Sequence, residues 1–276
     1  MSGTRDPSLR AAVRGIGLLG PGLVDWSLGQ ALLRDPTGWA VAPTVLAAPA
    51  LLPPAERRRA GAIVKLSMAV ADQACTQAGV DPHTLATVFT ASSGDAANCH
   101  ALCEALASAE RAVSPTRFTN SVHNAAAGYW HIATTSRAPS SSLCAHDASF
   151  GAGLLEALTQ SIALGRAVLL VAGDVPYPEP LQGVRPLPDA FGAALLLDAT
   201  PGAPSLATLT LALSAAPASG CGHAGLDALR AGVPAARCLP LLQALARGGP
   251  AALVLDYLDG LSLDVRLEPP DRKSVV

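Results

Sequence analysis

The chain contains little charge and few aromatic side chains. Only 14% of its 276 residues are Asp, Glu, Lys or Arg, only 4% are Phe, Trp or Tyr, and the formal net charge is −2. The one basic run, Arg57 to Arg59, is most simply a solvated helix face, so no nucleic-acid partner is expected. Half of the residues are apolar, which supports a large core and leaves little charge for the surface. We therefore expect a sizeable apolar interface with another protein.

Signals for secretion, membrane insertion and metal binding are also missing. Residues 1–10 contain no apolar signal-peptide segment, and no apolar run reaches the ~18 residues of a membrane helix. The six cysteines include no C-x-x-C pair. Cys99 and Cys103 lie four residues apart on a predicted helix without a second ligand pair. We predict a cytoplasmic protein with buried, reduced thiols, no membrane span, no metal and no cofactor.

Hydrophobic patterns predict alternating strands and helices up to about residue 200. The expected strands are 11–16, 87–91, 141–145, 168–172 and 191–197. The expected helices are 26–33, capped by Asp25, 55–78, 96–109, capped by Asp95, 121–135 and 149–164. Such alternation is typical of a layered α/β fold.

The composition changes after residue 200. A strand is predicted at 205–215, a helix at 239–247, and a hairpin at 251–267 around Asp259 and Gly260. Residues 269–276 are polar and are predicted to form a frayed tail. We therefore divide the chain into a domain at 1–200 and a shorter α/β segment at 201–276 that packs on it.

A glycine-rich stretch, Gly15 to Gly20, has the form G-x-G-x-x-G. This pattern occurs in dinucleotide-binding turns, where it precedes a helix. Here Pro21 and Gly22 interrupt the expected helix start, so the dinucleotide interpretation is weak. A strand and turn without a bound nucleotide is the favoured interpretation.

The most informative block is 118–157. It contains Asn124, an Ala-rich run ending at Gly128, and an Ala-Pro-Ser turn at Pro139, followed by a strand and a predicted helix. This order resembles the active-site half of a β-ketoacyl synthase, in which a reactive Cys follows the Pro by eight residues. Here that position is Asp147. A carboxylate cannot form the thioester that the thiolate forms.

The resemblance covers residues 10–200 and implies a thiolase-like layered α/β fold with a complete N-terminal half and a strongly shortened C-terminal half. The glycine-rich stretch is similar to the first strand and turn of that family. In that family the second half carries two catalytic histidines. Its two signature motifs there, His-Gly-Thr-Gly-Thr and Asn-Ser-Phe-Gly-Phe-Gly-Gly, are absent, and His223 is predicted to be a loop histidine. The block 114–130 is most similar to chain length factors of bacterial aryl-polyene, xanthomonadin-like, pigment pathways.

This resemblance implies a non-condensing subunit that pairs with a catalytic β-ketoacyl synthase, meets acyl carrier protein through that partner and shapes the acyl tunnel. In thiolase-like dimers the strand before the nucleophile lies at the two-fold axis. The implied interface residues are Tyr129, Trp130, Ser140, Ser141, Ser142, Leu143 and Cys144. The implied pocket residues are His123, Asn124, His146, Asp147 and Phe150.

Two alternatives stay open. Ser149 could serve as the nucleophile of a weak acyltransferase or thioesterase, with a nearby histidine as base, although Asp147 replaces the first Gly of a nucleophile elbow. The chain could also form a homodimeric scaffold. Without catalysis, we expect Ser149 to start a helix, His123 and Asn124 to make capping or interface hydrogen bonds, and Asp147 to stay charged in a buried pocket, stabilised by the helix N-terminus.

Overall fold

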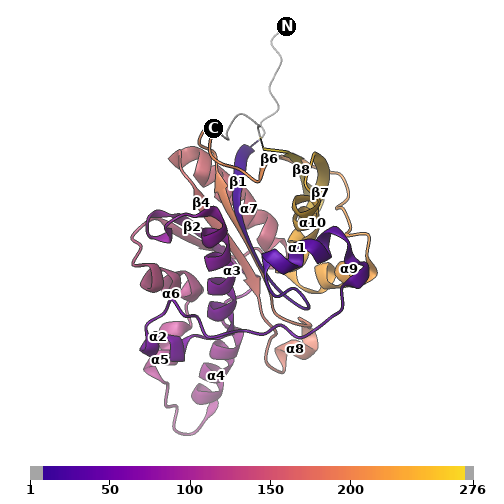
Figure 1. Ribbon diagram of the computed structural model, residues 1–276. Helices are drawn as coiled ribbons and strands as arrows, with labels where there is room; N and C mark the ends of the chain where they lie inside the picture. The colour runs from indigo at the N-terminus through magenta and orange to yellow at the C-terminus, as the bar shows by residue number, and fades with distance from the viewer. Residues whose placement is uncertain (1–8, 271–276) are drawn as a thin grey trace.

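The computed structural model describes residues 9–270 and contains one eight-stranded sheet between two layers of helices (Figure 1). The strand order is β3-β2-β4-β5-β1-β6-β8-β7. Strands β2, β3 and β4 run parallel, and every other neighbouring pair is antiparallel. The strands are β1 (Leu9–Leu19), β2 (Ala86–Thr90), β3 (Ser140–Leu143), β4 (Val168–Asp174), β5 (Phe191–Asp198), β6 (Ala207–Ser214), β7 (Ala251–Leu258) and β8 (Leu261–Glu268).

Helices cover both faces of the sheet. On one face α3 and α6 pack over the central strands, and on the other face α7, α10 and α1 do so (Figure 1). The helices are α1 (Trp26–Arg34), α2 (Pro54–Arg59), α3 (Ala62–Ala78), α4 (Ala96–Ala107), α5 (Pro115–Asn120), α6 (Ala125–Thr134), α7 (Ser149–Leu164), α8 (Leu181–Val184), α9 (Ala224–Gly232) and α10 (Leu239–Arg247). Short 3-10 turns include η3 (His146–Ala148) and η4 (Pro234–Cys238).

Strand β4 shows why the central strands are continuous apolar runs. Val168, Leu170 and Ala172 belong to the core beneath α7, whereas Leu169 and Val171 belong to the core beneath α3. Successive side chains of a strand point to opposite faces, so a strand covered on both sides must be apolar at every position. The predicted strand at 168–172 and its layered setting are confirmed.

The glycines of β1 allow α3 to pack directly on the strand. A Cβ atom at Gly15 would overlap the carbonyl oxygen of Ala74, and one at Gly17 would overlap that of Val70. Both glycines lie inside β1 rather than at a strand-to-helix turn. Close backbone packing therefore accounts for this part of the G-x-G-x-x-G pattern without a nucleotide.

The helices at 149–164 and 239–247, the hairpin at 251–267 and the caps Asp25 and Asp95 are confirmed. The single helix predicted at 55–78 is wrong, because the chain turns at Gly61 between α2 and α3. The helix predicted at 121–135 is also wrong in extent. It begins at Ala125 and follows a separate helix, α5, which Ser114 caps by accepting the backbone N–H of Arg117 at 3.5 Å.

Residues after 200 extend the same sheet. Strand β6 pairs with β1, and the β7–β8 hairpin completes that edge. The predictions missed α9, whose N-cap is His223: its Nδ1 accepts the N–H of Leu226 at 3.4 Å, and its ring meets Trp39 edge to face with centroids 5.7 Å apart. The prediction that His223 is a loop residue is therefore corrected to a helix cap.

The predicted layered α/β fold is confirmed. The division at residue 200 stays a prediction. The predicted frayed tail at 269–276 and the segment 1–8, on which the signal-peptide prediction rests, lie largely or wholly outside the described residues. Within residues 9–270, no helix is long and apolar enough to cross a membrane.

The prediction of six buried thiols is wrong. Cys75, Cys221 and Cys238 are buried, but Cys99, Cys103 and Cys144 are exposed. The exposed pair on α4 belongs to a helix that projects away from the sheet with α5 (Figure 1). The helix is apolar in composition, but few of its side chains reach a core.

Candidate functional site

The carboxyl ends of the parallel strands define the region where the nucleophile was expected. Strand β3 ends at Leu143, the turn η3 follows, and α7 begins at Ser149. Asp147 lies in η3, at the junction between strand and helix. Strand β4, which lies parallel to β3 on the other side of β2, ends at Asp174. In α/β sheets, ligands and reactive groups gather at this edge of the strands.

Two arginines hold the Asp147 carboxylate. Arg185 Nη2 donates to Oδ1 at 2.7 Å, and Arg237 Nη2 donates to Oδ2 at 3.2 Å. The Asp147 side chain is 44% exposed, and the two arginine side chains are 24% and 22% exposed. The expected buried pocket with stabilisation from a helix N-terminus is therefore corrected: guanidinium groups supply the hydrogen bonds, and the carboxylate reaches solvent. No thiol stands at this position, so the position cannot form a thioester.

His146 shapes the turn that presents Asp147. Its backbone is left-handed, with φ of 52°, which is uncommon for a residue other than glycine. Its side chain is 72% exposed, and its Nδ1 lies 3.4 Å from Asp147 Oδ1. His146 therefore sits at the surface beside the ion pairs and lines none of the pockets described below.

Ser149 is a structural residue in this geometry. It is 1% exposed. Its hydroxyl donates toward the carbonyl oxygens of His146 at 2.7 Å and Ala91 at 3.1 Å, and accepts the N–H of Ala145 at 3.0 Å. All three partners are backbone atoms, so this hydroxyl ties the strand end to the helix start, as expected of a residue that starts a helix. A substrate would have to displace this packing to reach it.

Behind the turn lies a buried polar network around Asp174, which is 2% exposed. Its Oδ1 accepts the N–H and the hydroxyl of Ser92, both at 2.7 Å, and its Oδ2 accepts the N–H of Ala235 in η4 at 2.8 Å. Burial raises the pKa of the Asp174 carboxyl, and these hydrogen bonds oppose that shift. Asp174 thus links β4, the end of β2 and the C-terminal segment. The sequence analysis placed the strand at 168–172 and assigned Asp174 no role.

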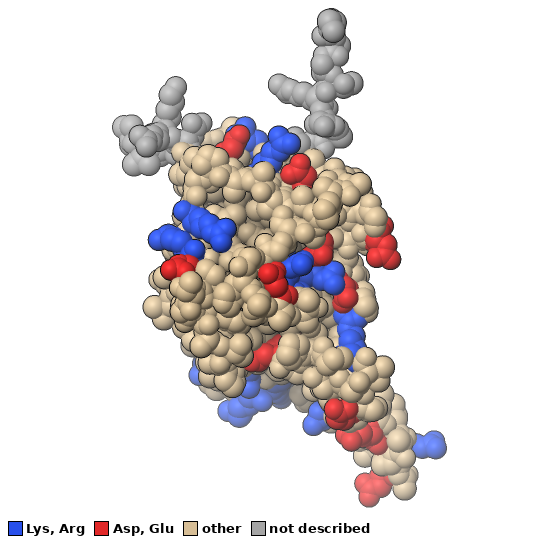
Figure 2. Space-filling view, turned by 90° about the vertical axis from the view of Figure 1, so that its right-hand side faces the viewer, with Lys and Arg blue, Asp and Glu red and all other residues tan. Residues whose placement is uncertain are grey.

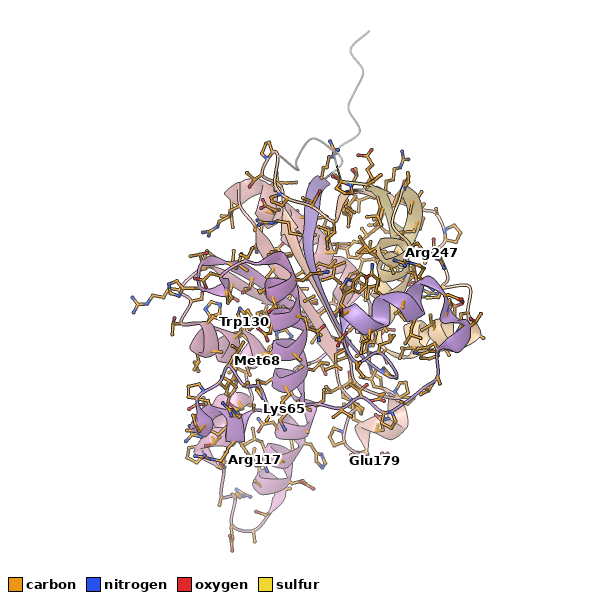
Figure 3. The ribbon with its side chains drawn as sticks, viewed as in Figure 1. Lys65, Met68, Arg117, Trp130, Glu179 and Arg247 are labelled. Carbon is orange, nitrogen blue, oxygen red and sulfur yellow. The ribbon has the colours of Figure 1, made fainter. Side chains whose placement is uncertain are left out.

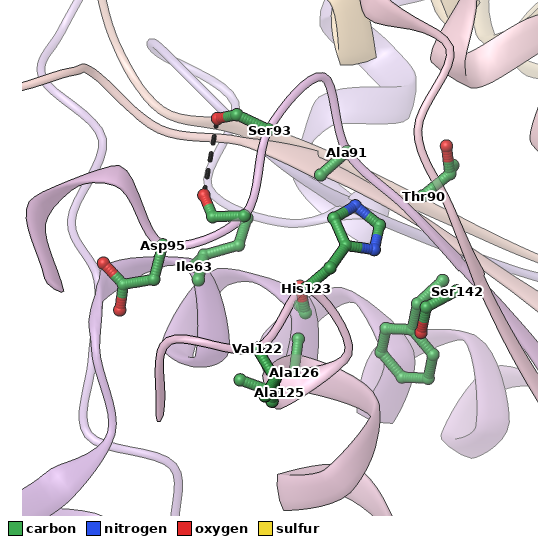
Figure 4. A pocket seen from close by; sticks show the side chains of 13 residues that line it. Ile63, Thr90, Ala91, Ser93, Asp95, Val122, His123, Ala125, Ala126 and Ser142 are labelled. Atoms are coloured by element: carbon green, nitrogen blue, oxygen red, sulfur yellow. Dashed lines mark hydrogen bonds between the residues drawn. The ribbon is translucent and has the colours of Figure 1, made fainter. Parts of the chain in front are cut away.

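The expected pocket residues do not share one pocket. His123 projects into a hollow between Ala91 and Ser142, near the turn that precedes α6 (Figure 4). Asn124 is at the N-cap of α6 without a side-chain capping bond and lines a separate depression with Arg59. Neither makes the capping bond that was one of the expectations.

Phe150 is 2% exposed and belongs to the core beneath α7. Its assignment to a pocket is therefore corrected to a core role. Of the five expected residues, His146 and Asp147 are in contact, and His123 stands alone in the hollow.

A second hollow of about 420 Å³ opens beside the one in Figure 4 and shares Ser93, Gly94, Asp95 and His123 with it. It is also lined by Cys99, His100 and Cys103 of α4 and by Leu181 of α8. The predicted i, i+4 cysteine pair therefore faces an open hollow. Within residues 9–270, no three His, Cys, Asp or Glu side chains are grouped as a metal site.

Two of the expected interface residues belong instead to the core. Trp130 is 0% and Tyr129 is 6% exposed, and both pack in the layer beneath α3. Figure 3 shows Trp130 beside α3, near Met68. Their assignment to a partner surface is corrected: they hold α6 on its own sheet.

Among the strands of residues 9–270, β3 forms a free edge of the sheet, because β2 is its only neighbour there. The N–H of Thr87 bonds to Pro139 O, and the N–H of Ala91 bonds to Leu143 O. Since backbone groups alternate along a parallel strand, Ser140 and Ser142 direct their N–H and C=O groups away from the sheet. The side chains of the expected serines have partners within the chain or line a hollow: Ser140 accepts from Thr87 Oγ1 at 2.8 Å, Ser141 accepts from Gln160 Nε2 at 2.8 Å, and Ser142 lines the hollow of Figure 4.

The sequence matches a family model described as "Beta-ketoacyl synthase, N-terminal domain" over residues 31–228. The chain belongs to this family. No curated protein matches the sequence.

Solved structures with the same fold include ketosynthase complexes. One is the ketosynthase ApeO in complex with its chain length factor ApeC from Xenorhabdus doucetiae, at 23% identity, a TM-score of 0.70, and coverage of 93% of this chain and 99% of the other. The structure titled AntDE:AntF, a type II PKS acyl-carrier protein in complex with its ketosynthase, matches at 12% identity and a TM-score of 0.75 over 95% and 99% of the two chains. The ishigamide ketosynthase/chain length factor matches at 16% identity and a TM-score of 0.68 over 95% and 99%. These similarities concern the fold of this ketosynthase-like chain.

Proposed function

We propose that this ketosynthase-like chain is a non-condensing subunit, a chain length factor, that pairs in the cytoplasm with a catalytic β-ketoacyl synthase of type II polyketide or polyene synthesis. In the pair, the partner supplies the reactive Cys and both histidines and receives the acyl carrier protein. This chain completes the partner's active site and shapes the acyl tunnel. The resemblance of residues 114–130 favours an aryl-polyene pathway, and the match to a complex of a ketosynthase with its chain length factor supports the pairing.

The observation that carries the proposal is the carboxylate at the nucleophile position. Asp147 stands at the strand-to-helix junction, and Arg185 and Arg237 engage its two oxygens. A carboxylate neutralised in this way is a poor nucleophile and has no sulfur for a thioester. The two motifs that mark the histidine-bearing second half of the family are absent from the sequence as well.

The free edge of β3 supports the pairing. An edge strand with unpaired backbone groups readily pairs with another chain, and soluble proteins usually protect such edges. Three apolar side chains of α5, α6 and the turn between them are also exposed: Phe118, Val122 and Ile132 are 69%, 49% and 49% exposed, and Val122 lines the hollow of Figure 4 together with Ser142 of β3. Charged residues make up only 14% of the chain, and most of the opposite face, on the side of α1 and α9, is likewise neither acidic nor basic (Figure 2). A partner that pairs with β3 would supply hydrogen bonds to its unpaired backbone groups and would cover these apolar side chains.

The alternative of a Ser149 acyltransferase is disfavoured by the burial of that hydroxyl and its three backbone hydrogen bonds. A fluorophosphonate probe tests it directly, and stoichiometric labelling that Ser149→Ala abolishes would establish it. The homodimeric scaffold is tested by the oligomeric state of the chain with and without a ketosynthase.

The proposal itself is tested by condensation assays on the isolated chain. Purified protein is incubated with acyl- and malonyl-loaded carrier proteins, and ketoacyl products are sought by mass spectrometry. We expect no product. Asp147→Cys should give none either, because the decarboxylating histidines are still missing. Turnover by the isolated wild-type chain would refute the proposal.

A further inference from the structure

The three charged groups at the nucleophile position come from distant parts of the chain. Asp147 belongs to η3, Arg185 follows α8 in the proline-rich loop, and Arg237 belongs to η4 of the C-terminal segment. The arginines are 38 and 90 residues away from Asp147 in sequence. Each takes one oxygen of the same carboxylate, so a single side chain joins three segments.

The charges of this group are unbalanced. Two guanidinium groups face one carboxylate, and His146 Nδ1 lies 3.4 Å from the same carboxylate as a further group that can become positive. Burial raises the pKa of Asp174, and the positive charge of Arg185 is near enough to oppose part of that rise. Without Asp147, the two arginines would lie near each other with Asp174 as the remaining nearby carboxylate, itself occupied by Ser92 and Ala235.

We propose that Arg185 and Arg237 form an anion-binding site and that the Asp147 carboxylate is its resident anion, which fastens η4 to the turn before α7. Two guanidinium groups converging on one carboxylate are a common way to recognise carboxylates. The side chain of Asp147 is 44% exposed, so a small anion from solvent can reach the position once the side chain is shortened. The inference does not depend on a ketosynthase partner.

A chemical-rescue experiment tests this assignment. Asp147→Ala removes the carboxylate but keeps the Cβ atom, and because the position is partly exposed, the two guanidinium groups become open to a small carboxylate from solvent such as acetate. We expect its melting temperature to fall by about 3–6 °C, the consequence of losing two partly exposed ion pairs in a chain of this size. Sodium acetate should restore a substantial part of that loss, whereas sodium chloride at the same ionic strength should restore less. The wild type should show no such preference for acetate.

The matched control is Glu268→Ala. Glu268 pairs with Arg10 at 2.9 Å, but both side chains are at least 60% exposed, so its removal should change the melting temperature by less than about 1 °C and should give no acetate effect. If the alanine variant does not fold, Asp147→Asn replaces it in the stability and hydrogen-exchange measurements, because asparagine keeps the shape and loses the charge.

Hydrogen exchange gives a second readout. The fastening predicts faster exchange in 233–239 for the Asp147 variants, while β4 and β5 keep their protection. If Asp147→Ala loses no more stability than Glu268→Ala, or if acetate and chloride act equally on it, Asp147 is not the resident anion of this site. An unchanged exchange rate in 233–239 would refute the fastening of η4.

Discussion

Replacing Ser142 with proline tests the outer edge of β3 without removing a hydrogen bond inside the sheet. The backbone N–H of Ser142 points away from β2, so proline at this position removes no hydrogen bond within the sheet and is compatible with an edge strand. The side chain is directed into the hollow of Figure 4 and is small. We expect the isolated Ser142→Pro chain to melt within a few degrees of the wild type.

Binding to a ketosynthase should respond very differently. If β3 pairs with the partner's strand, proline removes one donor, leaves a partner carbonyl without its hydrogen bond, and places a ring between the strands. An unsatisfied buried carbonyl costs about 1–3 kcal/mol, and the displaced strand adds further lost contacts. A total of about 3 kcal/mol corresponds to a loss of affinity of about a hundredfold.

Two variants serve as controls for this prediction. Ser142→Ala keeps the N–H and should bind normally. Ser141→Pro, one position away, removes the N–H that faces β2 and should destabilise the free chain. Affinity is measured by titration against the ketosynthase, and stability by thermal melting. A Ser142→Pro chain that folds and binds within threefold of the wild type would show that β3 is not the paired edge.

Two further predictions concern the buried network and the thiols. Asp174→Ala should lower the free energy of unfolding by about 2–4 kcal/mol, because the buried N–H groups of Ser92 and Ala235 lose their acceptor; urea unfolding that matches the wild type would contradict this role. At pH 8, a disulfide reagent should titrate only the exposed thiols of the folded chain, because burial raises the pKa of Cys75 and of Cys221 to about 12 and that of Cys238 well above its usual value. The exposed thiols are Cys99, Cys103 and Cys144, and rapid labelling of a fourth thiol would show that Cys75, Cys221 or Cys238 is not buried.

The sequence was sufficient where the signal is local. Apolar periodicity and the flanking residues predict α7, α10 and the hairpin at Gly260, because each of these elements is specified by residues within its own span. The extra helix α5 was missed although Ser114 and Pro115 form a standard helix start. The helix-start signal at Ser114 and Pro115 was present, but the apolar pattern of residues 121–135 favoured one longer helix.

The sequence was insufficient where the signal is tertiary. Asp147 could be aligned by counting from Pro139, but its partners Arg185 and Arg237 lie in segments with no pattern that points to it. Trp130 illustrates a second limit. An apolar aromatic on a helix fits either a core or an interface, and only the packing of α6 against α3 shows that it is core.

The most direct test of the central claim is reconstitution of the pair. The tagged chain is co-expressed with a catalytic ketosynthase from its own genome, and the purified complex and each separate subunit are supplied with loaded carrier proteins. The account predicts a stable heterodimer on size-exclusion chromatography and products of defined length from the complex, with none from this chain alone. A wild-type chain that elutes by itself and leaves the ketosynthase products unchanged would contradict it.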